Sequence, residues 1–139
     1  MVGLDTGQPY VRVTKNPWRN LKTASSERKI PLVGEALWAA RRISEADNAS
    51  DFAFPRYNST SPTAANSASA ALNKWLKQYV PAGCTMHSFR HSMRDRLRAV
   101  QCPADITYQI GGWTTDGVGQ GYGSGYPLSV LQEWLEKAK

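Results

Sequence analysis

Residues 87–122 read HSFRHSMRDRLRAVQCPADITYQIGGWTTDGVGQGY, and this stretch decides how the rest of the chain is interpreted. Its first half has the apolar spacing of an amphipathic helix, with His87 and Arg90 three residues apart at the start. The pair Gly111-Gly112 is typical of a helix end, because glycine readily adopts the left-handed conformation that closes many helices. Tyr122 closes the stretch in a glycine-rich setting. The segment therefore offers an imidazole, an arginine and a tyrosine in one ordered run.

The composition indicates a single folded domain over residues 1–139. Hydrophobic residues make up 41% of the chain, which is enough for a packed core at this length. The net charge of +6 favours an anionic partner such as nucleic acid. The sequence shows neither an apolar run of membrane-spanning length nor a signal-peptide core, so we expect a cytoplasmic protein without a membrane partner. Its two cysteines, Cys84 and Cys102, are expected to be free thiols.

The first part of the chain is predicted to form a small three-stranded antiparallel sheet within about residues 9–33. Residues 9–13 (PYVRV) alternate in polarity and contain β-branched side chains, which is typical of a strand. Two further extended segments, near 18–23 and 28–33, flank a polar turn. Lys22 lies just before that turn, where a sheet projects a side chain outward.

From about residue 34 to residue 139 the apolar residues recur with helical spacing, so the fold class is α+β, mainly α, with the sheet followed by a helical bundle. The predicted helices cover about 34–47, 66–79, 88–100, a segment from Pro103 to Gly111, and 127–138. Asn66 is the predicted cap of the second helix. We expect the buried stripe of that helix to contain Ala68, Leu72, Trp75, Leu76 and Tyr79, and Phe52, Phe54 and Tyr57 to attach the preceding loop to the core.

Phosphodiester cleavage needs a nucleophile, neutralisation of the non-bridging oxygens and a proton for the leaving oxygen. An arginine pairs two oxygens at once, and an imidazole donates a hydrogen bond near neutral pH. A lysine can protonate an alkoxide, and a tyrosine can act as the nucleophile in a strongly positive site. All four residue types are present, as Arg90, His87, Lys22 and Tyr122.

The order of these residues resembles the catalytic domain of the tyrosine recombinases, the phage-integrase family. His87-Ser88-Phe89-Arg90 matches the family's H-x-x-R motif, and Gly112-Trp113 matches its position for glycine followed by histidine or tryptophan. Tyr122, nine residues after the tryptophan, has the usual place of the nucleophile. Leu21-Lys22-Thr23, followed by residues 28–32 (RKIPL), resembles the β-hairpin that carries the catalytic lysine. The resemblance extends over nearly the whole chain, and the ordered set is more specific than any one motif.

The resemblance implies site-specific DNA recombination or integration by strand cleavage and rejoining through a 3′-phosphotyrosine. Tyr122 would attack the scissile phosphate and free a 5′-hydroxyl, while Arg90 and His87 would hold the phosphate oxygens. Lys22 would protonate the leaving oxygen, and Trp113 would pack against the site. Neither a metal nor another cofactor is required by this chemistry.

The implied partners are a double-stranded DNA attachment site and, for the full-length protein, other recombinase protomers in a synaptic tetramer. Arg94 and His91 lie on the same predicted helix as the H-x-x-R motif and are the predicted DNA contacts. The family also implies a bacterial or phage-encoded protein, such as one from a prophage.

The family has a further catalytic arginine upstream of the hairpin, in a helix that ends in a Gly-Leu-like sequence. Gly3-Leu4 matches the end of that segment, but no arginine precedes it, and Arg12 lies in a predicted strand. The N-terminal domain with which such enzymes encircle DNA has no counterpart either. Loss of one transition-state donor typically costs about 100- to 1,000-fold in rate. We therefore expect this chain to be a catalytic-domain fragment that is nearly inactive alone.

Several alternatives stay open at this point. The chain could be a non-catalytic DNA-binding fragment or a prophage remnant. Cys84, His87, His91 and Cys102 have spacings found in zinc sites, which would suit a small zinc-stabilised binding module. Tyr126 competes with Tyr122 as the nucleophile, or it anchors the last helix.

The last predicted helix has an apolar face that suits either of two roles. It could dock on a neighbouring protomer or pack on the chain's own core, and we expect the second. Its face consists of Leu128, Leu131, Trp134, Leu135 and Ala138.

Overall fold

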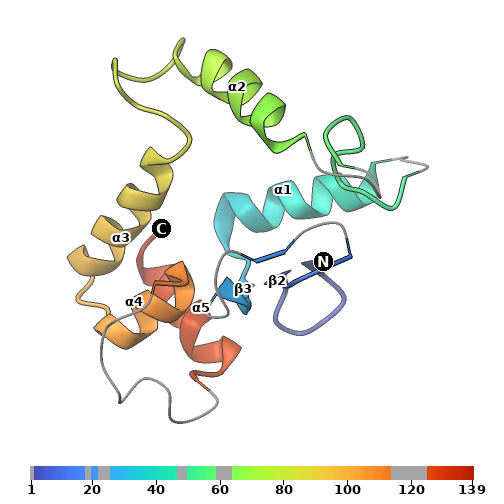
Figure 1. Cartoon of the computed structure of the whole chain (residues 1–139). Coiled ribbons are helices and arrows are strands. Elements are labelled where there is room, and N and C mark those ends of the chain that lie inside the picture. The colour runs from blue at the N-terminus through green and yellow to red at the C-terminus, as the bar shows by residue number, and fades with distance from the viewer. Residues whose placement is uncertain (1, 18–19, 22–25, 47–49, 59–63, 114–124) are drawn as a thin grey trace.

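The computed structural model describes residues 2–17, 20–21, 26–46, 50–58, 64–113 and 125–139. Over these residues the chain is a mixed α and β fold, with five helices and a three-stranded antiparallel sheet (Figure 1). The strands are β1 (Val2–Gly3), β2 (Tyr10–Val13) and β3 (Arg28–Pro31). The helices are α1 (Gly34–Glu45), α2 (Ala65–Leu76), α3 (Ser88–Ala99), α4 (Ala104–Gly111) and α5 (Leu128–Lys137). The predicted class is thus confirmed at the level of a small sheet followed by helices.

The sheet has the predicted number of strands, but one strand differs from the prediction. Strand β2 pairs with β3 in antiparallel register, from Tyr10 opposite Pro31 to Val13 opposite Arg28. Its other edge pairs with β1, whereas the described residues of the predicted strand 18–23, Asn20 and Leu21, are not in a strand. The other residues of that segment lie outside the described ranges. A two-residue strand such as β1 is too short to produce an alternating pattern, so it could not be predicted from the sequence.

Position 3 requires glycine because there is no space for a side chain. Gly3 lies directly opposite Tyr10, and a Cβ at Gly3 would come 2.8 Å from the tyrosine ring. Any larger residue would therefore push the ring away from the edge of the sheet.

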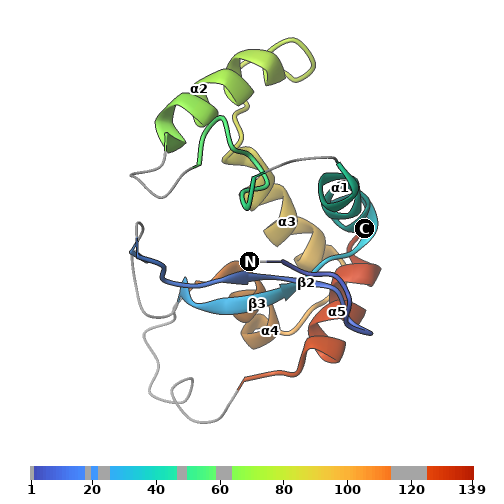
Figure 2. The ribbon, with the colours of Figure 1, turned by 90° about the vertical axis from the view of Figure 1, so that its right-hand side faces the viewer.

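The core lies between α3, α4, α5 and β3. Figure 2 shows the arrangement of these elements from a second direction. Leu97 of α3 is completely buried, and Leu131 of α5 is 1% exposed. The buried cluster consists of Leu97, Ile106, Ile110, Leu131, Leu135 and Ala138. The last helix therefore packs on the chain's own core, which confirms the expected one of its two roles.

The second helix does not bury the stripe predicted for it. Only Leu76 is buried, whereas Trp75 and Tyr79 are 55% and 67% exposed. Both views show that α2 lies apart from the sheet and from α5, so the rings of Trp75 and Tyr79 contact each other, at a centroid distance of 4.8 Å (Figures 1 and 2). The predicted cap is also wrong, because the helix begins at Ala65 after Ala64, without a side-chain cap.

The other predicted helices are close to the observed ones, with two differences in burial. Helix α1 ends at Glu45 and buries none of its residues fully. Phe54 is largely exposed, and the half-buried Phe52 and Tyr57 are not among the residues packed against the core cluster, so the expected attachment of this loop to the core is not observed. None of the described helices has both the length and the apolar character needed to cross a membrane.

Candidate functional site

The start of α3 is fixed by hydrogen bonds between Thr85 and the first two residues of the predicted H-x-x-R motif. The Thr85 backbone N–H donates to the Ser88 hydroxyl at 3.0 Å, and the His87 N–H donates to the Thr85 hydroxyl at 3.3 Å. These contacts satisfy backbone donors that a helix start leaves without partners. His87 is consequently the cap residue of α3, exposed at its end, and Arg90 lies one turn further on.

Arg90 and Arg94 meet Trp113 of the turn that follows α4. The guanidinium carbon of Arg90 lies 4.4 Å from the centre of the indole ring, and that of Arg94 lies 5.4 Å away. Guanidinium groups stack well on aromatic faces, and each such contact stabilises the pair by about 0.5–1 kcal/mol at exposed sites. The structure therefore brings three predicted site residues together from α3 and from the turn that follows α4.

A residue that the sequence analysis missed, Arg28 of β3, belongs to the same cluster. Its Nε donates to the Ile110 carbonyl at 3.1 Å, and its Nη1 donates to the Ser26 carbonyl at 2.8 Å. Partial burial, and to a smaller extent the positive charge of Arg90, lower the pKa of Arg28 from its ordinary value. Arg28 shares a strand face with half-buried Ile30, whereas Lys29 between them is exposed. An arginine on the inward face of a strand was the signal that could have identified it.

The turn after α4 positions the indole through two glycines. Gly112 is left-handed, with φ of 63°, and both its N–H and that of Trp113 donate to the Tyr108 carbonyl. The helix therefore ends at the predicted glycine pair. The left-handed residue reverses the chain, so that the Trp113 ring lies against Gly111. A Cβ at Gly111 would overlap the Trp113 ring, and a Cβ at Gly112 would lie 2.6 Å from the Arg28 guanidinium carbon.

Substitution of Gly111 by alanine is expected to displace the indole from Arg90 and to destabilise the fold by roughly 1–3 kcal/mol through overpacking. The reason is that the added methyl group occupies the space of the Trp113 ring. Urea denaturation followed by circular dichroism measures the change in the free energy of unfolding. Gly7→Ala is the matched control, because nothing lies within 4 Å of its added Cβ. Equal stability of the two variants would contradict the observed position of Trp113.

Two of the five predicted catalytic residues, Lys22 and Tyr122, lie outside the described residues. Glu27, which precedes β3, accepts hydrogen bonds from Thr14 at 2.8 Å and from Arg12 at 3.3 Å. The Thr14 hydroxyl, followed by the Arg12 guanidinium, lowers the pKa of the Glu27 carboxyl from its ordinary value.

Tyr126, the alternative nucleophile, has its backbone fixed on α4. The Gln109 amide accepts from the Tyr126 N–H at 2.8 Å and donates to the Tyr126 carbonyl at 2.9 Å. Gln109 was not singled out from the sequence, where a lone glutamine carries no signal. These two bonds hold the start of the last helix against α4, which agrees with an anchoring role for Tyr126.

The four-ligand zinc site considered as an alternative is not assembled. The described ranges, which include Cys84, His87, His91 and Cys102, contain no group of three or more histidine, cysteine or acidic side chains that could hold a metal ion. Burial also raises the pKa of the Cys102 thiol, which disfavours the thiolate that a zinc ion needs. The spacing of the four residues therefore does not correspond to a four-ligand centre in this fold.

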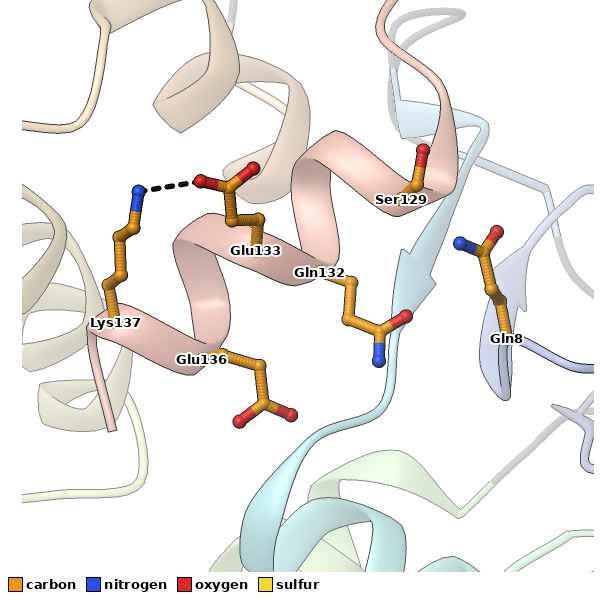
Figure 3. Close-up of a pocket in the computed structure, with 6 residues that line it drawn as sticks. All are labelled: Gln8, Ser129, Gln132, Glu133, Glu136 and Lys137. Carbon is orange, nitrogen blue, oxygen red and sulfur yellow. Dashed lines mark hydrogen bonds and ion pairs between the residues drawn. The ribbon is translucent and has the colours of Figure 1, made fainter.

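An open hollow of about 490 Å³ lies elsewhere on the surface, between Gln8 and the outer face of α5. Figure 3 shows its polar lining, including an ion pair of 2.7 Å between Lys137 and Glu133. None of the predicted site residues lines it, and its two glutamates, Glu133 and Glu136, make it unsuitable for an anion.

The cluster around Trp113 has the charge of an anion-binding site. Within the described part of the chain, neither Arg28, Arg90 nor Arg94 forms an ion pair with a carboxylate. The Nε of Arg94 is buried there without a hydrogen-bond partner. Two guanidinium groups stacked on one indole, with the charge of Arg28 near Arg90, suit a phosphate, whose oxygens accept several charge-assisted hydrogen bonds at once.

Comparisons with known proteins do not assign the chain to a family. No protein-family model matches the chain, and neither does any curated protein or solved structure.

Proposed function

We propose that the chain is part of the catalytic domain of a tyrosine recombinase, which cleaves and rejoins DNA at a specific site through a 3′-phosphotyrosine. The observation that supports this most is the contact of Arg90 with Trp113, since the motifs that carry the two residues are separate in the sequence. His87 lies one turn before Arg90 on the same helix. The order of these residues along the chain resembles that family, and their arrangement suits a phosphate.

In the proposed reaction, the Tyr122 oxygen attacks the scissile phosphorus, and the bond from phosphorus to the 5′ oxygen breaks. Lys22 gives its proton to the departing 5′ oxygen, and the phenolic proton passes to solvent. Arg90 and His87 hold the non-bridging oxygens, where negative charge develops. Stacking on Trp113 restricts the Arg90 guanidinium, so less conformational entropy is lost when phosphate binds. Attack by a second strand's 5′-hydroxyl reverses these steps and releases the tyrosine.

Arg28 and Arg94 add positive charge near Arg90, beside the proposed phosphate contacts. Arg28 is held by two backbone carbonyls, so it supports the turn and keeps its charge near Arg90. His91 and Arg94 continue the basic face of α3 and are proposed DNA contacts. The partners in this proposal are duplex DNA and, during strand exchange, further copies of the recombinase.

Covalent trapping on nicked duplexes tests this function and identifies the nucleophile. A pool of such duplexes with a randomised centre removes the need to know the target sequence. We expect an adduct that survives detergent, with DNA attached to Tyr122. Tyr122→Phe is expected to reduce the adduct at least about a thousandfold, since the nucleophile itself is lost. Tyr126→Phe is the matched control and is expected to retain adduct formation.

The trapping needs a protein with a complete set of phosphate contacts. Since no residue of the printed sequence matches the family's other arginine, it is run on the 139-residue chain and on the chain extended by any upstream codons of its reading frame. DNA binding without an adduct from either protein would favour the alternative of a non-catalytic DNA-binding fragment. An adduct on Tyr126 would show that the nucleophile was assigned to the wrong residue.

A further inference from the structure

The chain contains only two histidines, and both belong to one face of α3. His87 and His91 are four residues apart, and their rings meet edge to face with centroids 5.1 Å apart and planes at 74°. Both residues are exposed. Side chains at this spacing lie one above the other on a helix, so two imidazoles can reach the same point in solvent.

The distance between the rings fits a shared metal ion. A zinc–nitrogen bond is about 2.0–2.1 Å, and the centre of an imidazole lies roughly 1.1 Å behind its nitrogen, so each ring centre would be about 3.2 Å from the ion. At a tetrahedral angle, two such rings have centres about 5.2 Å apart. The observed separation of 5.1 Å is close to this value, so the two rings are already spaced as a shared ion requires.

We propose that His87 and His91 form a two-imidazole site for a divalent transition-metal ion such as zinc, nickel or copper. Neutral imidazole is a preferred ligand of all three ions. This site differs from the four-ligand zinc centre excluded above, because it uses no cysteine and contributes nothing to the core. Water fills the remaining coordination positions, since no third protein ligand adjoins the pair among the described residues.

The charges near the pair set the strength of this site. Arg90 and Arg94 belong to the same face of α3, and their positive charges weaken the binding of a cation. Both guanidinium groups are directed onto the Trp113 ring, which leaves the two imidazoles exposed beside them. We therefore expect affinity in the micromolar range rather than the much tighter binding of a structural zinc site. In the proposed function His87 contacts the scissile phosphate, so a bound ion and DNA compete for one imidazole.

Calorimetric titration of the tag-free 139-residue chain with Ni²⁺ tests the site in the absence of DNA, so its outcome is independent of the recombinase proposal. The parent chain is expected to bind one ion. The double variant His91→Ser with Ser92→His keeps the composition, charge and number of histidines, but it moves one ring off the shared face. Both positions are exposed, so the fold is expected to persist, as circular dichroism can verify.

The exchange variant is expected to bind Ni²⁺ at least about tenfold more weakly, since a chelate of two nitrogens becomes single-nitrogen coordination. A second double variant, Cys84→Ser with Cys102→Ser, is expected to bind as the parent does. Equal affinity of the parent and the exchange variant would overturn the proposal, and so would loss of binding in the cysteine variant.

Discussion

Replacement of Leu97 by alanine is expected to lower the free energy of unfolding by about 3–5 kcal/mol. Leu97 has no exposed surface and lies in the cluster formed by α3, α4 and α5. Its truncation leaves a cavity whose walls belong to three helices, and these cannot all close on it without moving the Arg90 face of α3. Since a small domain has about 5–15 kcal/mol of stability in total, the variant would be close to unfolding. Urea denaturation followed by circular dichroism and by tryptophan fluorescence measures the change.

The matched control for this substitution is Leu72→Ala. Leu72 lies on α2 and is 46% exposed, so it buries little apolar surface and leaves no cavity. We expect a loss below about 1 kcal/mol, because alanine is also a slightly better helix former. Similar losses at the two positions would contradict this core and would mean that the outer face of α2 is covered in solution.

Replacement of Arg90 by lysine is expected to reduce the rate of covalent adduct formation about 100- to 1,000-fold, with little change in fold stability. Lysine keeps the positive charge but loses the planar fork that pairs two phosphate oxygens and the stacking on Trp113. The rate is measured by trapping on the nicked duplexes described above, with the protein that gives the adduct. The salt dependence of duplex binding should change little, because it reports mainly the number of charges near the phosphates.

The control for this second prediction is Arg98→Lys on the same helix. Arg98 is exposed and pairs with Asp95 at 3.5 Å, away from Trp113. Its substitution is expected to leave the rate within about twofold of the parent, as surface changes usually have small effects. If Arg90→Lys formed adduct as fast as Arg98→Lys, the guanidinium of Arg90 would not be a transition-state contact, and the proposed function would lose its main support.

Local sequence patterns were enough to identify the elements whose signals lie within a few residues. Helical spacing predicted α3 and α5, and the glycine pair predicted the end of α4. The spacing of His87, Arg90 and Arg94 placed them on one predicted helix. Local patterns did not predict β1, because two residues are too few to show an alternation of polar and apolar side chains. They also predicted the wrong cap for α2.

Lys22 and Tyr122 stay predictions of the sequence, because they lie outside the described residues. The trapping experiment above tests Tyr122 directly. The two hydrogen bonds of Glu27 and the two of Gln109 were visible only in the structure.

The sequence by itself determined which residues could bind phosphate and on which helix they lie, because periodicity and turn chemistry depend on near neighbours along the chain. Only the tertiary structure decided that Arg28 joins Arg90, that Trp113 stacks beneath two guanidinium groups, and that α2 exposes its aromatic residues. These outcomes depend on which distant segments pack together. The burial of apolar side chains in the core around Leu97 determines which segments pack together. This core contains residues of several helices, so the pattern of one segment cannot predict it.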